Sequence, residues 1–125
     1  MTGLVARYPY PAPVAAYGNG GFRFADMSHR GSILCLPSGI EAWPAISAEA
    51  LTVSDFAKVL AEVPAGYALL LGTGLTQVFP DAAVTRAFAE ARIGLEPMST
   101  GAAARTYNLL LSEGRMVAAA LIAVP

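Results

Sequence analysis

The sequence has one cysteine, one histidine and few charged side chains, and each scarcity excludes a class of protein. The lone cysteine, Cys35, cannot form an internal disulfide, and the lone histidine, His29, has no companion ligands for a metal. The eight basic residues are scattered singly and the net charge is −1, which is unlike the basic surface of a nucleic-acid-binding protein. We therefore expect no metal, no cofactor and no nucleic-acid partner.

Long apolar runs are also missing, although 55% of the residues are hydrophobic and only 14% are charged. No run reaches the roughly 18 residues that a membrane span requires, so no membrane span is predicted. The first residues lack the apolar core of a signal peptide and the Arg/Ser-rich pattern of a transit peptide. A cytoplasmic protein is expected, and 125 residues fit a single domain with one hydrophobic core.

The first third of the chain has the pattern of an arm followed by short strands. Prolines and tyrosines alternate through residues 1–16, which predicts an irregular arm, and residues 17–125 are predicted to form one α/β domain. Apolar stretches separated by Gly- and Pro-rich turns then predict an antiparallel meander. Its strands are expected at 22–24, 31–36 and 40–43, with a turn at 26–30.

The remaining two thirds alternate between helical and strand patterns. Helices are expected from Thr52 to Glu62, from Asp81 to the terminator Gly94, and from Ser99 or Thr100 to Gly114; strands are expected at 67–71, 95–98 and 116–124. Such alternation favours parallel pairing. The predicted fold is therefore α/β, with a mixed sheet, an N-terminal antiparallel meander and flanking helices in a three-layer, sandwich-like arrangement.

The last predicted helix carries polar side chains in an otherwise apolar segment. At about 100° per residue, Arg105, Asn108 and Ser112 fall on one stripe, and small or apolar residues cover most of the remaining circumference. We expect a helix buried on most sides, in which Arg105 and Asn108 must find partners or a ligand. The partner of Arg105 could equally be a carboxylate such as Glu96 or Glu113.

Gly72, Thr73 and Gly74 follow a predicted buried strand and form the second candidate feature. Glycines allow backbone N–H groups to converge on an anion, but a tight turn at the strand end explains the same pattern. Ser99 or Thr100 can cap the last helix, whose N-terminus could receive an anion. A ligand site would thus comprise Gly72, Thr73, Gly74, Thr100, Arg105 and Asn108, at the carboxyl ends of neighbouring strands.

No catalytic residue is predicted. The chain contains no Ser-His-Asp order, no paired-carboxylate spacing, and no HExxH or CxxC motif. His29 lies in a predicted turn, where we expect it to be exposed to solvent. Cys35 lies in the apolar stretch 33–36, where we expect an inert, buried thiol.

Four segments together resemble a known family. They are Tyr-Gly-x-Gly-Gly-Phe-Arg-Phe at 17–24, Gly-Ser-Ile-Leu at 31–34, Leu-Leu-Gly-Thr-Gly at 70–74, and the stretch 96–115 around Arg-Thr-Tyr-Asn. They are similar to a family of small, largely uncharacterised domains that includes the mitochondrial assembly factor 3 of respiratory complex I (NADH:ubiquinone oxidoreductase). The resemblance implies a compact α/β domain and, for the mitochondrial relative, a non-catalytic assembly role near the inner membrane.

Two departures from the family pattern bear on chemistry. Many members of the family have an acidic residue where this chain has Ser99, and a cysteine where it has Ala104. Serine can cap a helix but cannot act as a general base, and alanine is no nucleophile.

These departures favour a structural or binding role over catalysis. Together with the resemblance, they lead to the hypothesis of a non-catalytic interaction protein, such as an assembly factor for respiratory complex I or a related membrane complex. Complex I subunits or assembly proteins would be its partners and would bring it to the inner membrane. The alternative is a small-molecule or anion-binding domain or enzyme with a cleft near Gly72–Gly74 and Arg105. A homodimer is compatible with either hypothesis.

Overall fold

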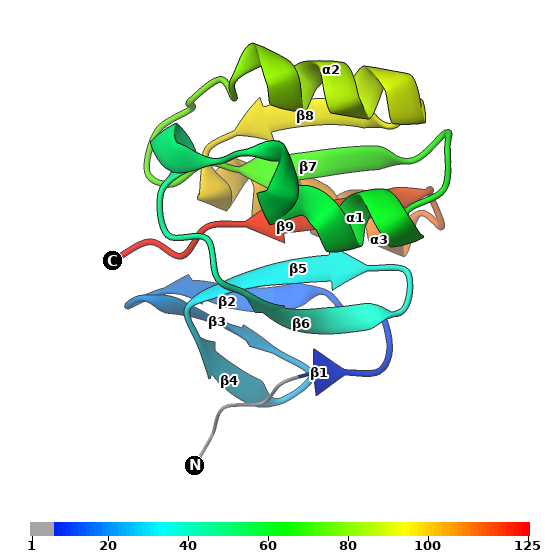
Figure 1. Ribbon diagram of the computed structural model, residues 1–125. Helices are drawn as coiled ribbons and strands as arrows, with labels where there is room; N and C mark the ends of the chain where they lie inside the picture. The colour runs from blue at the N-terminus through cyan, green and yellow to red at the C-terminus, as the bar shows by residue number, and fades with distance from the viewer. Residues whose placement is uncertain (1–6) are drawn as a thin grey trace.

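The computed structural model describes residues 7–125 and has two β-sheets and three α-helices in a mixed α/β arrangement (Figure 1). The strands are β1 (Arg7–Tyr8), β2 (Val14–Gly18), β3 (Gly21–Phe24), β4 (Met27–Arg30), β5 (Ser32–Leu36), β6 (Gly39–Trp43), β7 (Ala68–Gly72), β8 (Gly94–Met98) and β9 (Val117–Leu121). The helices are α1 (Ala57–Glu62), α2 (Ala82–Ala91) and α3 (Thr100–Ser112), with 3₁₀ turns η1 (Ala48–Ala50) and η2 (Val53–Phe56).

The larger sheet is mixed, as the sequence predicts. Its strand order is β1-β6-β5-β9-β7-β8. The pairs β1–β6, β6–β5 and β5–β9 are antiparallel, whereas the pairs β9–β7 and β7–β8 are parallel. The final strand, β9, therefore lies between β5 of the first half and β7 of the second. All five of its residues are buried, and three are alanines, which let the layers on both faces approach closely.

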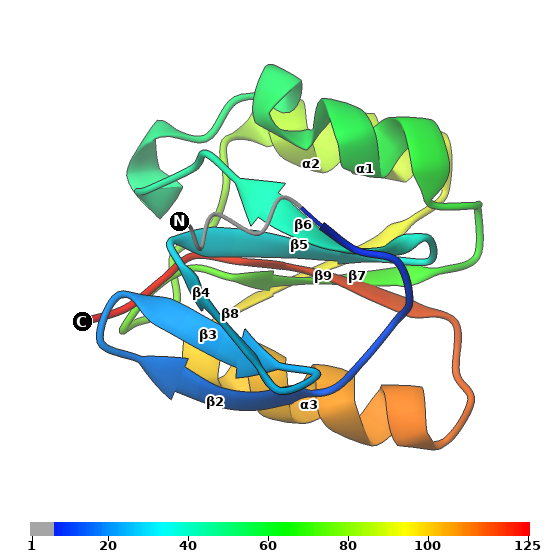
Figure 2. The same ribbon diagram turned by 90° about the horizontal axis from the view of Figure 1, so that it is seen from below.

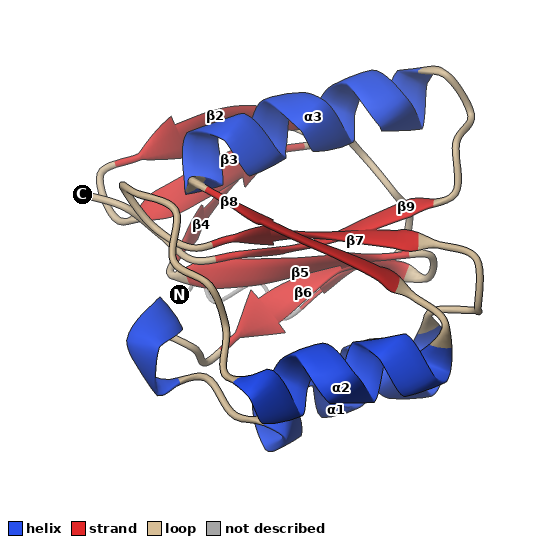
Figure 3. Ribbon diagram, turned by 90° about the horizontal axis from the view of Figure 1, so that it is seen from above, coloured by secondary structure: helices blue, strands red, loops and turns tan. Residues whose placement is uncertain are grey.

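Both faces of the larger sheet are covered, which gives three layers (Figures 2 and 3). Helices α1 and α2 pack on one face, where Leu69, Leu71 and Phe88 belong to one apolar cluster. Helix α3 and the small sheet pack on the other, where Leu70 and Tyr107 belong to a second cluster. Successive residues of β7 thus enter opposite cores, as a strand buried on both faces requires. The predicted three-layer fold is confirmed.

The predicted meander is divided between two sheets. Strands β5 and β6 pair in the larger sheet, whereas β3 pairs with β2 and β4 in a separate three-stranded antiparallel sheet. The predicted turn at 26–30 is wrong, because Met27–Arg30 forms β4. The turn is shorter, since Ala25 and Asp26 both take left-handed φ angles, 49° and 61°, as a two-residue hairpin turn requires.

Part of the predicted arm also forms strands. β1 pairs with β6, and β2 begins at Val14, so the irregular assignment is wrong for residues 7–8 and 14–16; residues 1–6 lie outside the described chain. Arg7 adds side-chain contacts to this edge pairing, because its guanidinium contacts Glu41 at 3.4 Å and donates to the Ser38 carbonyl at 3.1 Å. β1 has only two residues, and β2 follows the proline-rich stretch 9–13, so neither strand shows enough alternation to be detected in the sequence.

The predicted helices are confirmed, with changes at their ends. The first begins with η2, where the Thr52 N–H donates to Asp55 Oδ2 at 2.7 Å, and becomes α-helical only at Ala57. The second ends at Ala91 and is capped by Arg92, whose φ of 59° is left-handed, and Gly94 already belongs to β8. The predicted terminator was therefore two residues too late.

Candidate functional site

Thr100 joins the end of β7 to the start of α3 and to the segment after β9. Its side chain is fully buried; Oγ1 accepts a hydrogen bond from the Gly74 N–H at 3.0 Å and donates one to the Ile122 carbonyl at 2.7 Å. Its own N–H donates to the Gly74 carbonyl at 2.8 Å. Ser99, rather than Thr100, is the N-cap, and its Oγ accepts from the Ala102 N–H at 3.3 Å.

Gly72 makes this junction sterically possible. A Cβ there would lie 3.0 Å from Thr100 Cα and Oγ1 and from a methyl carbon of Leu121, which is closer than most real contacts allow. Glycine thus lets the end of β7 approach α3 and β9 closely.

Thr73 has its hydrogen-bonding groups occupied by the chain itself. Its Oγ1 donates toward the Thr76 and Met98 carbonyls, at 2.7 and 3.1 Å, and accepts from the Val78 N–H at 3.0 Å. Its N–H donates to the Met98 carbonyl at 2.8 Å. These contacts order a turn at the strand end, one of the two interpretations that the sequence leaves open.

Arg105 lies on the exposed side of α3. Its Nη1 donates to the phenol oxygen of Tyr17 at 3.0 Å. Neither carboxylate suggested by the sequence pairs with it: Glu113 instead contacts Arg115 at 3.6 Å, and the structure gives Glu96 no ion pair within residues 7–125. With Leu109 57% exposed as well, α3 is less buried than its apolar composition predicts.

Asn108 attaches α3 to the start of β2. Its Oδ1 accepts from the Val14 N–H, and its Nδ2 donates to the Val14 carbonyl, both at 2.8 Å. The amide thus supplies the donor and acceptor that a neighbouring β-strand would offer. This arrangement leaves little of the side chain's hydrogen-bonding capacity for a ligand.

The six predicted site residues thus fall into two groups. Gly72, Thr73, Gly74 and Thr100 meet at the junction of β7, α3 and the segment after β9, whereas Arg105 and Asn108 contact β2. The polar side chains in both groups bind other parts of the same chain.

Two buried ionisable groups, Cys35 and Tyr107, are poor candidates for catalysis. Cys35 is fully buried, as predicted, and burial raises the pKa of its thiol to about 12. Burial, and secondarily the nearby Cys35, raises the pKa of Tyr107 above its ordinary value. Both side chains are neutral at pH 7, so neither is an activated nucleophile. Across residues 7–125 the structure brings no three His, Cys, Asp or Glu side chains together as a metal site.

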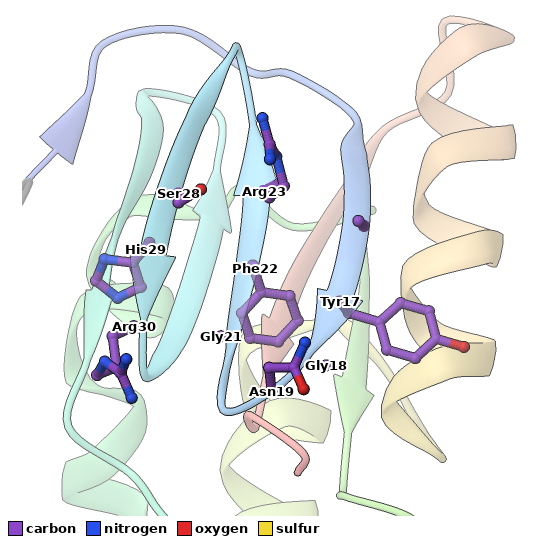
Figure 4. A pocket seen from close by; sticks show the side chains of 10 residues that line it. Tyr17, Gly18, Asn19, Gly21, Phe22, Arg23, Ser28, His29 and Arg30 are labelled. Atoms are coloured by element: carbon purple, nitrogen blue, oxygen red, sulfur yellow. The ribbon is translucent and has the colours of Figure 1, made fainter.

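A hollow lies on the small sheet, and the sequence alone did not predict it. It has a volume of about 590 Å³ and is lined by Ala16, Tyr17, Gly18, Asn19, Gly21, Phe22, Arg23, Ser28, His29 and Arg30 (Figure 4). His29 is 7% exposed, so the predicted exposure is wrong. Recognising 27–30 as a strand paired with 21–24 would have placed Arg23 and Arg30 on one face.

The chain is similar to proteins from bacteria and from mouse. An uncharacterized protein of Rhodobacter capsulatus is 35% identical over 113 residues, which are 90% of this chain and 86% of that protein. The mouse NADH dehydrogenase [ubiquinone] 1 alpha subcomplex assembly factor 3 is 27% identical over 122 residues, or 98% of this chain but 66% of the mouse protein.

The chain is also similar to a solved structure, and most of it matches a protein family. The structure, from Bartonella henselae and described as that of an outer membrane protein, is 48% identical with a TM-score of 0.89, covering 94% of this chain and 99% of that one. Residues 14–122 match the family described as "Protein of unknown function (DUF498/DUF598)". The chain therefore belongs to the DUF498/DUF598 family.

Proposed function

We propose that this protein is a non-catalytic interaction protein that assists the assembly of respiratory complex I or a related membrane complex. The similarity to the mouse assembly factor over 98% of this chain supports this role. The observation that carries the proposal is an ordered loop, residues 73–81, that presents large apolar side chains to solvent.

Leu75 and Phe79 are 73% and 74% exposed in this loop between β7 and α2. The loop is held in place by the bonds of Thr73 described above and by Gln77, whose Nε2 donates to the Pro97 carbonyl at 2.9 Å. Exposed apolar side chains lose the roughly 25 cal/mol per Å² that burial would provide, and a contact surface on a partner can supply that burial.

A second exposed apolar side chain extends the same end of the molecule. Ile46 is 89% exposed in the segment between β6 and η1, and Figures 1 and 3 show this segment beside the loop 73–81. We call Ile46, Leu75 and Phe79 the apolar end. Complex I subunits or assembly proteins are the proposed partners, and contact with them would hold the protein at the inner membrane. Within residues 7–125, no helix is long and apolar enough to cross a membrane.

The alternative, a small-molecule or anion-binding domain or enzyme with a cleft near Gly72–Gly74 and Arg105, has less support. The hydroxyls of Thr73 and Thr100 are bonded within the chain, and Arg105 binds Tyr17. A single domain over residues 17–125 and a homodimer remain predictions.

The test is affinity purification of the tagged protein from gently solubilised cells of its source organism, with quantitative mass spectrometry. A Leu75→Ser/Phe79→Ser variant changes the apolar end, and a Leu109→Ser/Met116→Ser variant changes two other exposed apolar residues, which are 57% and 58% exposed. Both variants should fold, since surface substitutions usually change stability by less than about 0.5 kcal/mol.

The native protein and the Leu109/Met116 control should enrich complex I subunits or their assembly proteins, and the Leu75/Phe79 variant should lose them. If the Leu75/Phe79 variant still enriches these proteins, the contact with them lies elsewhere than at the apolar end. No enrichment of such proteins by the native chain would overturn the proposed role.

A further inference from the structure

The outward face of the small sheet is made of two neighbouring rows of residues. Strand pairing places Ala16, Arg23 and Ser28 side by side in one row, and Gly18, Gly21 and Arg30 in the next. The other face of the same strands carries the buried Phe22 and Phe24, which pack into the core. Alternation therefore directs Arg23 and Arg30 away from the core, and both are exposed.

The two arginines concentrate positive charge in a chain whose net charge is −1. They occupy diagonal positions on adjacent strands, which are typically about 7–8 Å apart, and in Figure 4 their side chains extend toward opposite ends of the hollow. No carboxylate side chain lines the hollow. Among the described residues, neither guanidinium has an ion pair or a side-chain hydrogen bond, and the same holds for Arg86 and Arg92. Arg7, Lys58 and Arg115 pair with glutamates, and Arg105 donates to Tyr17.

Small residues leave a hollow in the sheet face that carries Arg23 and Arg30. Ala16, Gly18 and Gly21 leave the strand backbone uncovered, and a Cβ at Gly21 would collide with the His29 carbonyl oxygen, so this position excludes a side chain. Figure 4 shows Arg23 on the central strand, Arg30 at the end of the outer strand and Asn19 at the β2–β3 turn. The volume of about 590 Å³ lies within the range of small-molecule sites, roughly 300–1,000 Å³.

We propose that this hollow binds a small phosphorylated molecule. Two neighbouring guanidiniums match a ligand with at least two negative charges, and guanidinium groups bind phosphate oxygens through paired, charge-assisted hydrogen bonds. The Ser28 hydroxyl and the Asn19 amide provide neutral donors for further oxygens. The hollow exceeds the size of a phosphate ion, so it leaves room for an organic group.

This site is separate from the apolar end and from the six residues predicted from the sequence. It belongs to β2, β3 and β4, and Tyr17, the one lining residue that contacts Arg105, points toward α3 in Figure 4. A small ligand is favoured over an acidic protein segment because the ten lining residues all lie within positions 16–30 of one compact sheet and do not form an extended groove.

The experiment is a titration of ¹⁵N-labelled protein followed by two-dimensional NMR at constant ionic strength. The probes are pyrophosphate, glucose 6-phosphate and, as references, glucose and hexaglutamate. The variant Arg23→Gln/Arg30→Gln removes both charges from the hollow. The control Arg86→Gln removes an exposed arginine from α2, in the opposite layer.

Pyrophosphate and glucose 6-phosphate should shift amide signals within residues 16–30, and glucose should not. The dissociation constant for pyrophosphate should rise at least about tenfold in the Arg23/Arg30 variant and stay unchanged in Arg86→Gln. Because both arginines are exposed, a native-like spectrum of the variant is expected and verifies its fold. Equal binding by the variant, shifts confined to other residues, or tighter binding of hexaglutamate than of either phosphate compound would each overturn the proposal.

Discussion

Replacing Thr100 with valine tests whether the junction of β7, α3 and the segment after β9 is structural. Valine keeps the shape of the side chain but removes the hydroxyl that accepts from the Gly74 N–H and donates to the Ile122 carbonyl. Each backbone group left without a partner costs about 1–3 kcal/mol. After allowing for the added apolar methyl group, we expect a loss of about 2–4 kcal/mol, a large share of the roughly 5–15 kcal/mol that stabilises a typical domain.

Urea denaturation can measure this loss through the fluorescence of Trp43, the chain's one tryptophan, which is 4% exposed and packs on Phe56. Thr100→Ser keeps the hydroxyl and should lose only about 1 kcal/mol, from the missing methyl group. Thr106→Val, on the half-exposed side of the same helix, controls for the substitution itself. A Thr100→Val variant as stable as the native protein would refute the structural account of this hydroxyl.

Three further results are expected. Asn108→Ala should lower the free energy of unfolding by about 2–4 kcal/mol in the same assay, because both polar backbone groups of Val14 lose their partner; a loss below about 0.5 kcal/mol would contradict this. Arg105→Ala should change the free energy of unfolding by less than about 1.5 kcal/mol, because its bond to Tyr17 is exposed, and a larger loss would reveal a structural role beyond that bond. Burial raises the pKa of the Cys35 thiol from its ordinary 9.0 to about 12, so the thiol ionises at lower pH in the unfolded chain than in the native protein. The native protein should therefore resist iodoacetamide. Its free energy of unfolding should fall as pH rises from about 9 to about 12, and this fall should be less steep in Cys35→Ala. Equal slopes in the two proteins would contradict that pKa.

The second half of the fold could be predicted from the sequence because its elements are long and strongly patterned. The apolar stretch 67–71 and the Ser99 cap each indicate a local structure that tertiary contacts leave unchanged. In the first half, three strands could be predicted, but the division into two sheets could not, because Ala25-Asp26 forms a hairpin turn without the usual Asn-Gly or Asp-Gly signal. Because that turn was not predicted, β4 was not predicted either, nor was the sheet face that carries Arg23 and Arg30.

The candidate site was harder to predict because its contacts join distant residues. Asn108 and Val14 are 94 positions apart, and Arg105 and Tyr17 are 88 apart. A helical pattern shows that Asn108 and Arg105 need partners, but spacing within the helix contains no information about β2. The sequence therefore identified residues with unmet polar groups and left the nature of their partners open.

The place of β9 in the larger sheet has a consequence for synthesis of the protein on the ribosome. β5 can pair with β6, and β7 with β8, as soon as each pair has been made, but the two halves of the sheet join only through residues 117–121. Until these residues emerge, β5 and β7 each expose an unpaired edge to other nascent chains. A premature stop codon that removes the last tenth of the chain would thus leave two unconnected half-sheets, a substrate for quality-control proteases.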